Sequence, residues 1–553
     1  MERETGFEPA TSTLARSHST TELLPLSEMI INEGWGWGNG WRGYGGITVR
    51  KFFSIVLVIV GGFLATGASA QISYPNPIKH VIIVYQENRT VDNLLGSNSP
   101  SNQYYLPGLV VSTTGQAYTM TNGKKSVFTV NAVPIPLATT VGSTGSIDAD
   151  DYDPSHSHTS WGKACDAPVI TDPSSSCAMD GFNNVTVTCA KGATGCPGPT
   201  YPTYAYVEYS QVAPYFQIAS QYGYANYMFQ TNQGPSFPAH QFMFGGTSQP
   251  GNGVEPGWFV AENEPTRYSI NGCPSVAGTI IALVNPATQD EKTSIFPCFN
   301  HSTMVDVFAA ATPKITWTYY NPGNTSLLTA PNSMEAICTV KDGKCTGPYW
   351  TKGSTNGYVD IKPADVLTDI SDCKLANVSW VIPSSLESDH PTGTDGSGPS
   401  WVSSIVNAVG TQPKCKDGET YWNNTVILIT WDDWGGWYEH VVPPALSSKA
   451  PVNAASYVYG FRVPLMVVSA YTPAGTVSNT MGLDFGAMLK FTEEIFNLGV
   501  IPPGDYADSY ANDDLGEFFQ FSKPPRTFES IAAPVKKEVF LDPKRPQGPP
   551  DND

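Results

Sequence analysis

Residues 79–90 read KHVIIVYQENRT, and this stretch decides the fold class. Its centre, residues 81–85, is a continuous apolar run rich in β-branched side chains, which is typical of a strand buried on both faces of a parallel sheet. A polar cluster, residues 86–90, follows directly at the carboxyl end of this predicted strand. Ligands of open α/β sheets bind outside the carboxyl ends of the strands, so the cluster marks a candidate site.

The same pattern returns later in the chain. Residues 424–430 (NTVILIT) form a second apolar run, which ends in Trp431-Asp432-Asp433, and residues 464–469 (PLMVVS) form a third. Weaker strand candidates and helical patterns lie around them: strands at residues 315–319 and 378–382, and helices at residues 209–222, 303–311, 401–409 and 485–498. This alternation predicts a doubly wound α/β sheet with helices on both faces.

Composition and cysteines indicate an extracellular protein. The chain has 553 residues with 51 Gly, 46 Pro and only 14% charged residues, as in rigid, loop-rich proteins. Its ten cysteines all follow a predicted signal peptide, so we expect disulfides that staple long loop insertions such as residues 97–200. Pairing between sequence neighbours is the simplest arrangement: Cys165–Cys177, Cys189–Cys196, Cys273–Cys298, Cys338–Cys345 and Cys373–Cys415.

Residues 50–70, RKFFSIVLVIVGGFLATGASA, predict a signal peptide. A basic start, a short apolar core and Ala68-Ser69-Ala70 match the three parts of such a peptide, so we expect cleavage near Ala70 and a secreted or periplasmic protein. A retained N-terminal anchor is the alternative. The apolar run is shorter than the roughly 20 residues of a membrane span, so we expect no stable span in the mature chain.

The chain is therefore expected to have four parts. Residues 1–48 are interpreted as an extension from a misassigned start site, residues 49–70 as the signal peptide, and residues 71–522 as one large domain. Residues 523–553 form a Pro-rich, charged tail that we expect to be extended or disordered. The formal net charge of −19 opposes binding to a phosphate backbone, so no nucleic-acid partner is expected.

Four side chains at the predicted strand ends offer oxygen ligands for a metal ion. Asp432 and Asp433 supply two carboxylates, and the Gly435-Gly436 pair beyond them permits close approach of the backbone. Glu87 and Asn88 supply a third carboxylate and an amide oxygen. Each pair alone is more typical of a turn or a helix cap. Their expected meeting at one sheet edge is what predicts a metal site.

A serine and several histidines complete the candidate chemistry. Ser236 lies in GPSFP, residues 234–238, which Gly and Pro constrain as a loop that would hold a nucleophile at a fixed distance from a metal. It is not part of a G-x-S-x-G elbow, so a lipase-type triad is unsupported. Imidazoles bind phosphate oxygens or protonate a leaving alkoxide. Seven histidines follow the signal peptide: His80, His156, His158, His240, His301, His390 and His440.

These strings, in this order, resemble the bacterial phosphoesterase family that contains phosphatidylcholine-type phospholipases C and acid phosphatases. They are IKHVIIVYQENRTVDNLLG (78–96), DPSHSHTSW (153–161), GPSFPAHQFMFGGTS (234–248), SDHPTG (388–393), TWDDWGGWYEHVVPP (430–444) and YGFRVPLMVVS (459–469). The resemblance spans residues 78–500 and implies an alkaline-phosphatase-like fold, which makes residues 71–522 a phosphoesterase catalytic domain.

The resemblance also implies roles for individual residues. Glu87, Asn88, Asp432 and Asp433 match the metal ligands, and Ser236 matches the nucleophile that also touches the metal. The histidines implied for substrate binding and acid–base chemistry are His156, its neighbour His158, His390 and His440. Oxygen ligands favour Ca²⁺, Mg²⁺ or Mn²⁺, and nearby histidines leave Zn²⁺ and iron open. One departure is Ala239-His240, which stands where phospholipase-like members carry Asn-Arg.

The expected reaction is metal-dependent hydrolysis of a phosphoester through a phosphoseryl intermediate. The expected substrate is a small phosphomonoester, as for an acid phosphatase. A phospholipid substrate, as for a phospholipase C, is the first alternative. A non-catalytic surface or adhesion protein on the same scaffold is the second, and the joint presence of Glu87, Asn88, Ser236, Asp432 and Asp433 argues against it.

Overall fold

The computed structural model describes most of the chain after residue 75. The described residues are 76–138, 151–167, 177–191, 193, 196, 198–251, 254, 257–261, 271–285, 288–323, 326–416, 418–444 and 459–546. The chain divides into two units, Met1–Ser69 and Ala70–Asp553, and every described residue belongs to the second. The extension and the signal peptide predicted for residues 1–70 therefore lie outside the described residues.

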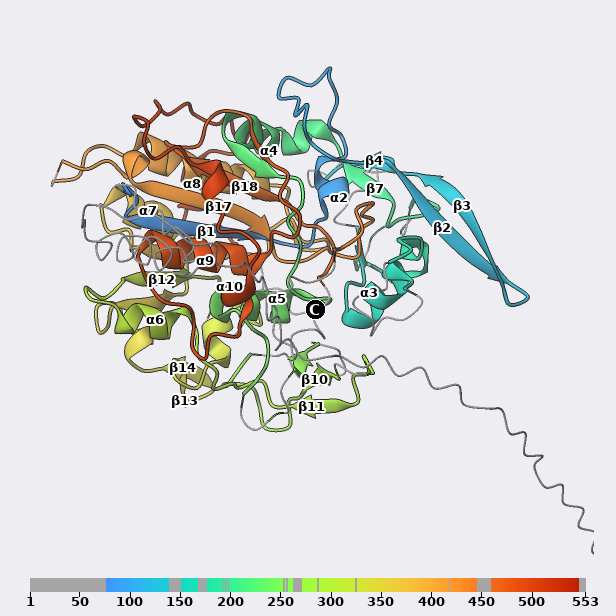
Figure 1. The fold of residues 1–553 in the computed structure, drawn as a ribbon, viewed down its shortest axis with the longest axis horizontal. Coiled ribbons are helices and arrows are strands. Elements are labelled where there is room, and N and C mark those ends of the chain that lie inside the picture. The colour runs from blue at the N-terminus through green and yellow to red at the C-terminus, as the bar shows by residue number, and fades with distance from the viewer. Residues whose placement is uncertain are drawn as a thin grey trace, which may run out of the picture. The chain divides into compact units, whose positions relative to one another are not determined.

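An eight-stranded sheet forms the centre of the described unit (Figure 1). Its strands are, in spatial order, β15 (Gly357–Asp360), β12 (Trp317–Tyr320), β16 (Val378–Val381), β1 (His80–Gln86), β17 (Thr425–Trp431), β18 (Leu465–Ser469), β8 (Gly223–Ala225) and β19 (Thr476–Ser478). All five strands expected from apolar runs are present. β1 and β17 are central and buried almost throughout, which explains why polar and apolar residues do not alternate in their sequences.

The direction of β18 differs from the expected parallel arrangement. β18 runs antiparallel to both β17 and β8, whereas the other neighbouring strands of the sheet are parallel. In the β17–β18 pair, Thr430 faces Leu465 and Val426 faces Ser469. β18 therefore begins at the edge where β17 ends. Its apolar run predicted a buried strand correctly, but such a run carries no information on strand direction.

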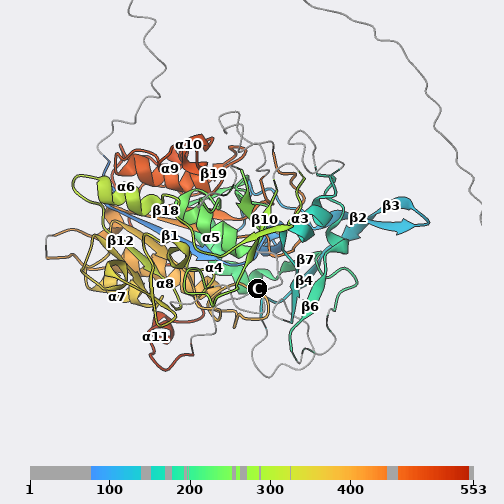
Figure 2. The ribbon, with the colours of Figure 1, turned by 90° about the horizontal axis from the view of Figure 1, so that it is seen from below.

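Helices cover both faces of the sheet, as expected (Figure 2). One layer contains α4 (Tyr209–Gln221), α7 (Asp365–Ser371), α8 (Gly398–Thr411) and α11 (Lys537–Phe540); the other contains α5 (Ser236–Gly245), α6 (Met304–Ala310), α9 (Phe485–Ile495) and α10 (Ala507–Tyr510). The four helices predicted from periodicity correspond to α4, α6, α8 and α9. The fold is a doubly wound α/β fold whose central sheet is mixed.

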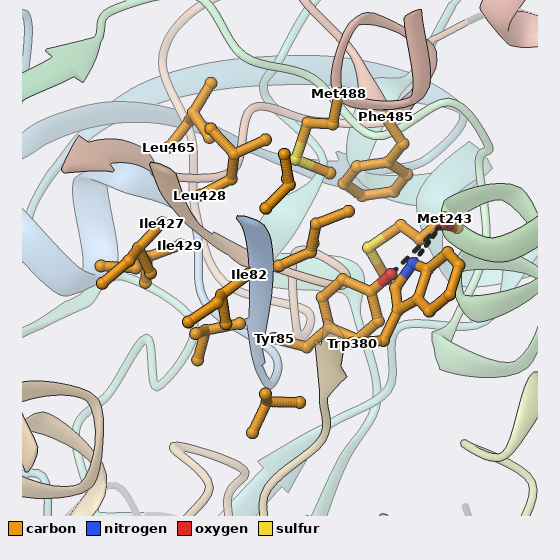
Figure 3. Packing of buried hydrophobic residues seen from close by; sticks show 14 of the residues in the cluster. Ile82, Tyr85, Met243, Trp380, Ile427, Leu428, Ile429, Leu465, Phe485 and Met488 are labelled. Atoms are coloured by element: carbon orange, nitrogen blue, oxygen red, sulfur yellow. Dashed lines mark hydrogen bonds between the residues drawn. The ribbon is translucent and has the colours of Figure 1, made fainter. Parts of the chain in front are cut away.

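Packing around β1 and β17 holds helix α5 against the sheet (Figure 3). Leu428 points toward Phe485 and Met488 of α9, while Ile427 and Ile429 point to the opposite face. The Met243 carbonyl of α5 accepts hydrogen bonds from the Tyr85 hydroxyl at 3.3 Å and from the Trp380 indole at 3.2 Å. Two buried donors on one carbonyl fix the position of α5 relative to β1 and β16.

The remaining elements lie in insertions around the sheet. They are α2 (Val91–Leu95), β2 (Thr114–Thr121), β3 (Lys124–Asn131), β4 (Val133–Ile135), β5 (Tyr152–Pro154), α3 (His158–Cys165), β6 (Val187–Cys189), β7 (Ala205–Val207), β9 (Phe259–Val260), β10 (Ile281–Val284), β11 (Thr293–Ile295), β13 (Thr339–Lys341) and β14 (Lys344–Thr346). β2 and β3 form a hairpin that extends away from the sheet (Figure 1). No helix among the described residues is long and apolar enough to cross a bilayer.

The ten cysteines form the five disulfides expected from pairing between neighbours: Cys165–Cys177, Cys189–Cys196, Cys273–Cys298, Cys338–Cys345 and Cys373–Cys415. No described cysteine is free. Each bridge closes a short stretch of chain, and the longest spans 42 residues. A full set of disulfides is typical of proteins from oxidising compartments.

The C-terminal segment is extended but not disordered over residues 523–546. The backbone N–H of Ile531 donates to Asn407 of α8, and that of Ala532 donates to Gln217 of α4, both at 2.8 Å. Phe540 of the short helix α11 is buried and packs against Trp401 with 5.4 Å between ring centroids. Specific contacts, which composition alone does not reveal, thus attach this segment to the helical layer.

Arg545 at the end of this segment holds the loop that contains His390. Its guanidinium bonds to Glu387, to Asp395 at 2.8 Å and to Ser397 at 3.0 Å. We expect Arg545→Met to lower the free energy of unfolding by about 3 kcal/mol, because it leaves the buried Glu387 carboxylate without its cation. Urea unfolding measures this loss. The exposed neighbour Lys544 gives the control, and equal unfolding midpoints for Arg545→Met and Lys544→Met would contradict the assignment.

Candidate active site

The carboxyl ends of β1 and β17 bring two pairs of candidate ligands together. Gln86 and Trp431 are register partners, so the residues that follow them share one edge of the sheet. The backbone N–H of Asn88 donates to Asp432 Oδ1 at 3.0 Å, and the same oxygen accepts the N–H of Asp433 at 2.7 Å. Glu87, Asn88, Asp432 and Asp433 are all buried. The meeting predicted from strand ends is therefore present.

Two tight backbone features shape this edge. Asn88 has a left-handed backbone with φ of 57°, which is uncommon outside glycine and tolerated best by residues such as Asn. Gly435 also has positive φ, and a Cβ there would lie 2.1 Å from the Asn88 carbonyl oxygen. The expected close approach at the Gly-Gly pair is thus an approach to the backbone of a candidate ligand.

Ser236 joins the cluster from helix α5. Its hydroxyl donates to Asp433 Oδ2 at 2.9 Å, and its side chain is buried. The GPSFP string was expected to be a loop, but Ser236 is the first residue of α5, after Pro235 as N-cap. Proline is tolerated in the first turn because the N–H groups there have no partner within the helix, so Pro238 does not stop the helix.

His240 also belongs to the cluster. In the sequence it stood out only because Ala239-His240 departs from the pattern of the resembling family. Its Nε2 lies 3.6 Å from Asp432 Oδ2 and 3.9 Å from Glu87 Oε1. Glu87, His240 and Asp432 together have the spacing of a group that could hold a metal ion. A signal was available, because residues four apart share one face of a helix and Ser236 precedes His240 by four positions.

His156 and His390 lie beside this cluster. Asn88 Nδ2 and His156 Nε2 are 3.0 Å apart, while His156 Nδ1 donates to the Pro154 carbonyl at 3.1 Å. His156 Nε2 is 4.0 Å from Asp433 Oδ2. The rings of His156 and His390 are 6.0 Å apart between centroids. The structure therefore places His156 next to the candidate ligands and His390 next to His156.

Arg89, in the same polar cluster as Glu87 and Asn88, positions the His390 loop. Its Nε and Nη2 both donate to the Asp389 carbonyl, at 2.9 and 2.6 Å. The guanidinium also stacks over the Trp437 ring, 5.0 Å from its centroid. Arg89 is buried, so this fork connects the end of β1 to the backbone immediately before His390.

The other two predicted histidines make their contacts elsewhere. His158 Nδ1 lies 2.8 Å from Glu291. His440 Nδ1 lies 2.6 Å from Asp92 Oδ2, within a network where Arg462 pairs with Glu439 at 2.9 Å. Among the contacts of the described residues, none links His158 or His440 to Ser236. The sequence strings around both histidines resemble those of the phosphoesterase family, but a short string does not specify the direction of a side chain.

Electrostatics within the cluster favour a bound cation. Burial raises the pKa of the Asp433 carboxyl, and the adjacent Asp432 carboxylate raises it further. Burial also acts to raise the pKa of Asp432, but its contacts with His240, Glu87 and Ser236 outweigh burial and lower that pKa. Like charges this close repel, and a cation between them relieves the repulsion.

The donor set fits a divalent metal ion. Asn88 Oδ1 and Asp432 Oδ2 are buried, and neither accepts a hydrogen bond from any described residue. A buried polar atom without a hydrogen bond is costly, and coordination of a cation satisfies it. Carboxylate, amide and hydroxyl oxygens with one imidazole form a set that both hard and borderline divalent ions accept. The cluster is therefore a candidate metal centre.

Several known proteins are similar to this chain. Phospholipase C A of Mycobacterium tuberculosis is 24% identical over 208 residues, which cover 34% of this chain and 38% of that protein. Non-hemolytic phospholipase C of Pseudomonas aeruginosa is 22% identical over 520 residues, which cover 86% of this chain and 64% of that protein. The chain thus spans less than two thirds of the length of these relatives. A solved protein of the alkaline phosphatase superfamily from Vibrio parahaemolyticus is 12% identical, with a TM-score of 0.28 over 57% of this chain and 64% of that one.

A match to a protein family covers nearly the same stretch as the strings above. The match runs from residue 78, two residues before β1, to residue 499, just after α9. It contains all the candidate ligands, Ser236 and both histidines beside them. Residues 78–499 match the Phosphoesterase family, and the chain belongs to that family.

Proposed function

We propose that the protein is a metal-dependent phosphoester hydrolase with Ser236 as its nucleophile. The observation that carries this proposal is the hydrogen bond from the buried Ser236 hydroxyl to Asp433, beside Glu87, Asn88 and Asp432. Attack on phosphorus needs a positioned hydroxyl, a group that takes its proton and positive charge for the phosphoryl oxygens. Family membership supports the same reaction class.

The proposed reaction begins with attack by Ser236, which is the first residue of α5. Its proton leaves along the hydrogen bond to Asp433, and the oxygen attacks phosphorus in line with the leaving alcohol. Held by Glu87, Asn88, Asp432 and Asp433, a divalent ion would lower the pKa of the hydroxyl and neutralise phosphoryl oxygens. The O–P bond to Ser236 forms as the bond to the leaving oxygen breaks, which gives a phosphoseryl enzyme.

The histidines beside the cluster provide the second proton transfer. His156 or His390, when protonated, donates a proton to the leaving alkoxide. The neutral imidazole then accepts a proton from the water that attacks the phosphoseryl group. Asp433 returns its proton to the Ser236 oxygen as the bond between that oxygen and phosphorus breaks, and phosphate is released. Hydrogen bonds orient both rings: His156 Nδ1 bonds to the Pro154 carbonyl, and His390 Nδ1 to the Pro391 carbonyl.

Phosphomonoesters are the proposed substrates. A monoester carries two negative charges near neutral pH, and a cluster with one metal position and three nearby imidazoles suits that charge better than the single charge of a diester. The alternative, a phospholipase C that cleaves a phosphodiester, is supported by the names of the relatives in Mycobacterium tuberculosis and Pseudomonas aeruginosa. In both cases the substrate is a small phosphoester or a phospholipid, not a nucleic acid.

Three substrates separate these proposals. We expect p-nitrophenyl phosphate to be hydrolysed at least about 100-fold faster, in kcat/KM, than bis-p-nitrophenyl phosphate or phosphatidylcholine vesicles, since charge complementarity is worth a few kcal/mol in a buried site. Chelator should abolish the activity and added metal should restore it. Faster cleavage of phosphatidylcholine would establish the phospholipase alternative. If no substrate is turned over at any pH or with any metal, both enzyme proposals are wrong, and the non-catalytic surface or adhesion protein is the remaining alternative.

We further propose that the protein acts outside the cytoplasm. Five disulfides support this location, because cytoplasmic thiols are kept reduced. The predicted signal peptide at residues 49–70 would provide the export route.

A further inference from the structure

His240 is a fully buried histidine directed at two carboxylates. Its Nε2 lies 3.6 Å from Asp432 Oδ2 and 3.9 Å from Glu87 Oε1. Neither ring nitrogen makes a hydrogen bond to any described residue. A structural histidine at such depth normally has hydrogen bonds on its ring nitrogens, so packing alone does not account for this arrangement.

The two distances are longer than hydrogen bonds and close to the spacing of ligands around one ion. Direct N–H···O bonds have lengths of roughly 2.7–3.2 Å. Nitrogen and oxygen ligands about 2.0–2.2 Å from one metal ion are roughly 3.0–3.5 Å apart at angles of 90–110°. The observed 3.6 and 3.9 Å lie a few tenths of an ångström beyond that spacing. Asp432 Oδ2, the nearer of the two oxygens, accepts no hydrogen bond from the described residues either.

The surroundings of His240 keep the ring in place. It makes an edge-to-face contact with Tyr85, with 5.2 Å between ring centroids. Tyr85 lies in β1, two residues before Glu87. The Tyr85 hydroxyl also donates to the Met243 carbonyl, one turn after His240 on α5. Packing therefore pre-organises the imidazole beside Glu87 and Asp432.

We propose that His240 is a nitrogen ligand of the metal ion, in addition to the oxygen ligands from the strand ends. This inference rests on the metal centre of the proposed function and specifies its ion. Imidazole suits Zn²⁺, Fe²⁺ and other first-row transition ions, whereas Ca²⁺ and Mg²⁺ prefer oxygen alone. The site therefore selects a transition ion over Ca²⁺ and Mg²⁺.

X-ray absorption at the zinc edge tests the inference without any assay of activity. The probe is the full chain loaded with one equivalent of Zn²⁺. We expect the outer-shell scattering of imidazole in the wild type, and its loss in His240→Gln. His156→Gln removes the other histidine near the carboxylates and should keep the signal. His80→Gln is the control: His80 is half-buried at the opposite end of β1, and its replacement should not change metal binding.

Affinities give a second readout. His240→Gln should weaken Zn²⁺ binding at least about 10-fold in calorimetry, as loss of an interaction around a metal typically does, and leave Mg²⁺ and Ca²⁺ binding within about 3-fold. Wild-type zinc spectra without imidazole scattering overturn the inference, and they do so even if His240→Gln fails to fold. An imidazole signal that persists in His240→Gln but disappears in His156→Gln also overturns it.

The outcomes separate this inference from the proposed function. An all-oxygen shell together with phosphoester hydrolysis refutes the role of His240 and keeps the enzyme. Imidazole coordination without hydrolysis of any phosphoester refutes the proposed function and keeps the ligand. A wild type that binds no divalent ion refutes both.

Discussion

Ser236→Ala is expected to lower kcat for phosphoester hydrolysis at least about 1000-fold, in keeping with the loss of a nucleophile in other hydrolases. The Ser236 hydroxyl donates to Asp433 at the start of α5, and alanine offers no atom that attacks phosphorus. Stability should change little, because the lost hydrogen bond contributes about 1 kcal/mol. Steady-state kinetics and a thermal melt of the same preparation measure the two effects.

Ser403→Ala provides the matched control for this experiment. Ser403 is equally buried, and its hydroxyl donates to the Pro399 carbonyl within α8, away from the cluster. Both variants thus lose one buried serine hydroxyl, and only Ser236→Ala should lose turnover. Trapping gives a further check, since rapid acid quench of wild type should capture phosphate on Ser236. Wild-type rates in Ser236→Ala would remove the serine from the mechanism.

Asp432→Asn is expected to weaken metal binding more than about 100-fold, and activity should fall with it. Mutation of a residue that only supports a metal ligand typically weakens binding by roughly 10- to 100-fold, and loss of a ligand itself should weaken it more. Asparagine keeps the shape and can still accept the backbone N–H groups of Asn88 and Asp433. What it loses is the negative charge between Glu87 and His240. Calorimetry with Zn²⁺, Mn²⁺ and Mg²⁺ measures the affinity directly.

The stability of the metal-free protein should move in the opposite direction. Asp432 and Asp433 are adjacent buried carboxylates, so the loss of one charge relieves repulsion when no ion is bound. We therefore expect the melting temperature of metal-free Asp432→Asn to equal or exceed that of wild type, while the rise on metal addition disappears. Asp369→Asn is the control. Asp369 is a buried carboxylate on α7, away from the cluster, and it binds Tyr320 and Lys352. Undiminished stabilisation of Asp432→Asn by metal would contradict its role as a ligand.

Prediction from sequence succeeded where local pattern is enough. The apolar runs before Gln86 and Trp431 became β1 and β17, and their parallel pairing in register brought Glu87 and Asp432 to one edge. Parallel strands end on the same side of a sheet, so a polar residue after each run predicts a shared site without knowledge of the rest. The disulfides were predictable for a related reason, since each bridge joins cysteines close in sequence.

Prediction failed where contacts depend on the packing of distant segments. The helix that begins at Ser236 was expected to be a loop because its Gly and Pro suggested one, yet proline in a first turn is harmless. The C-terminal segment is extended, which was one of the two expected states, but its hydrogen bonds to α4 and α8 were not foreseen. His158 and His440 matched family strings and still turned toward other carboxylates.

The sequence by itself determined the α/β class, the central strands, the disulfide pairs and the position of the two pairs of candidate ligands at the strand ends. Each of these follows from local periodicity or from proximity along the chain. The tertiary structure alone decided that β18 runs antiparallel and that His156 lies beside Asn88 and Asp433. It also decided that His240 meets Glu87 and Asp432. Those distances depend on how α5 sits on the sheet, which the buried bonds of Tyr85 and Trp380 to one carbonyl establish. No pattern within a single segment contains that information, since it arises only when segments far apart in the chain pack together.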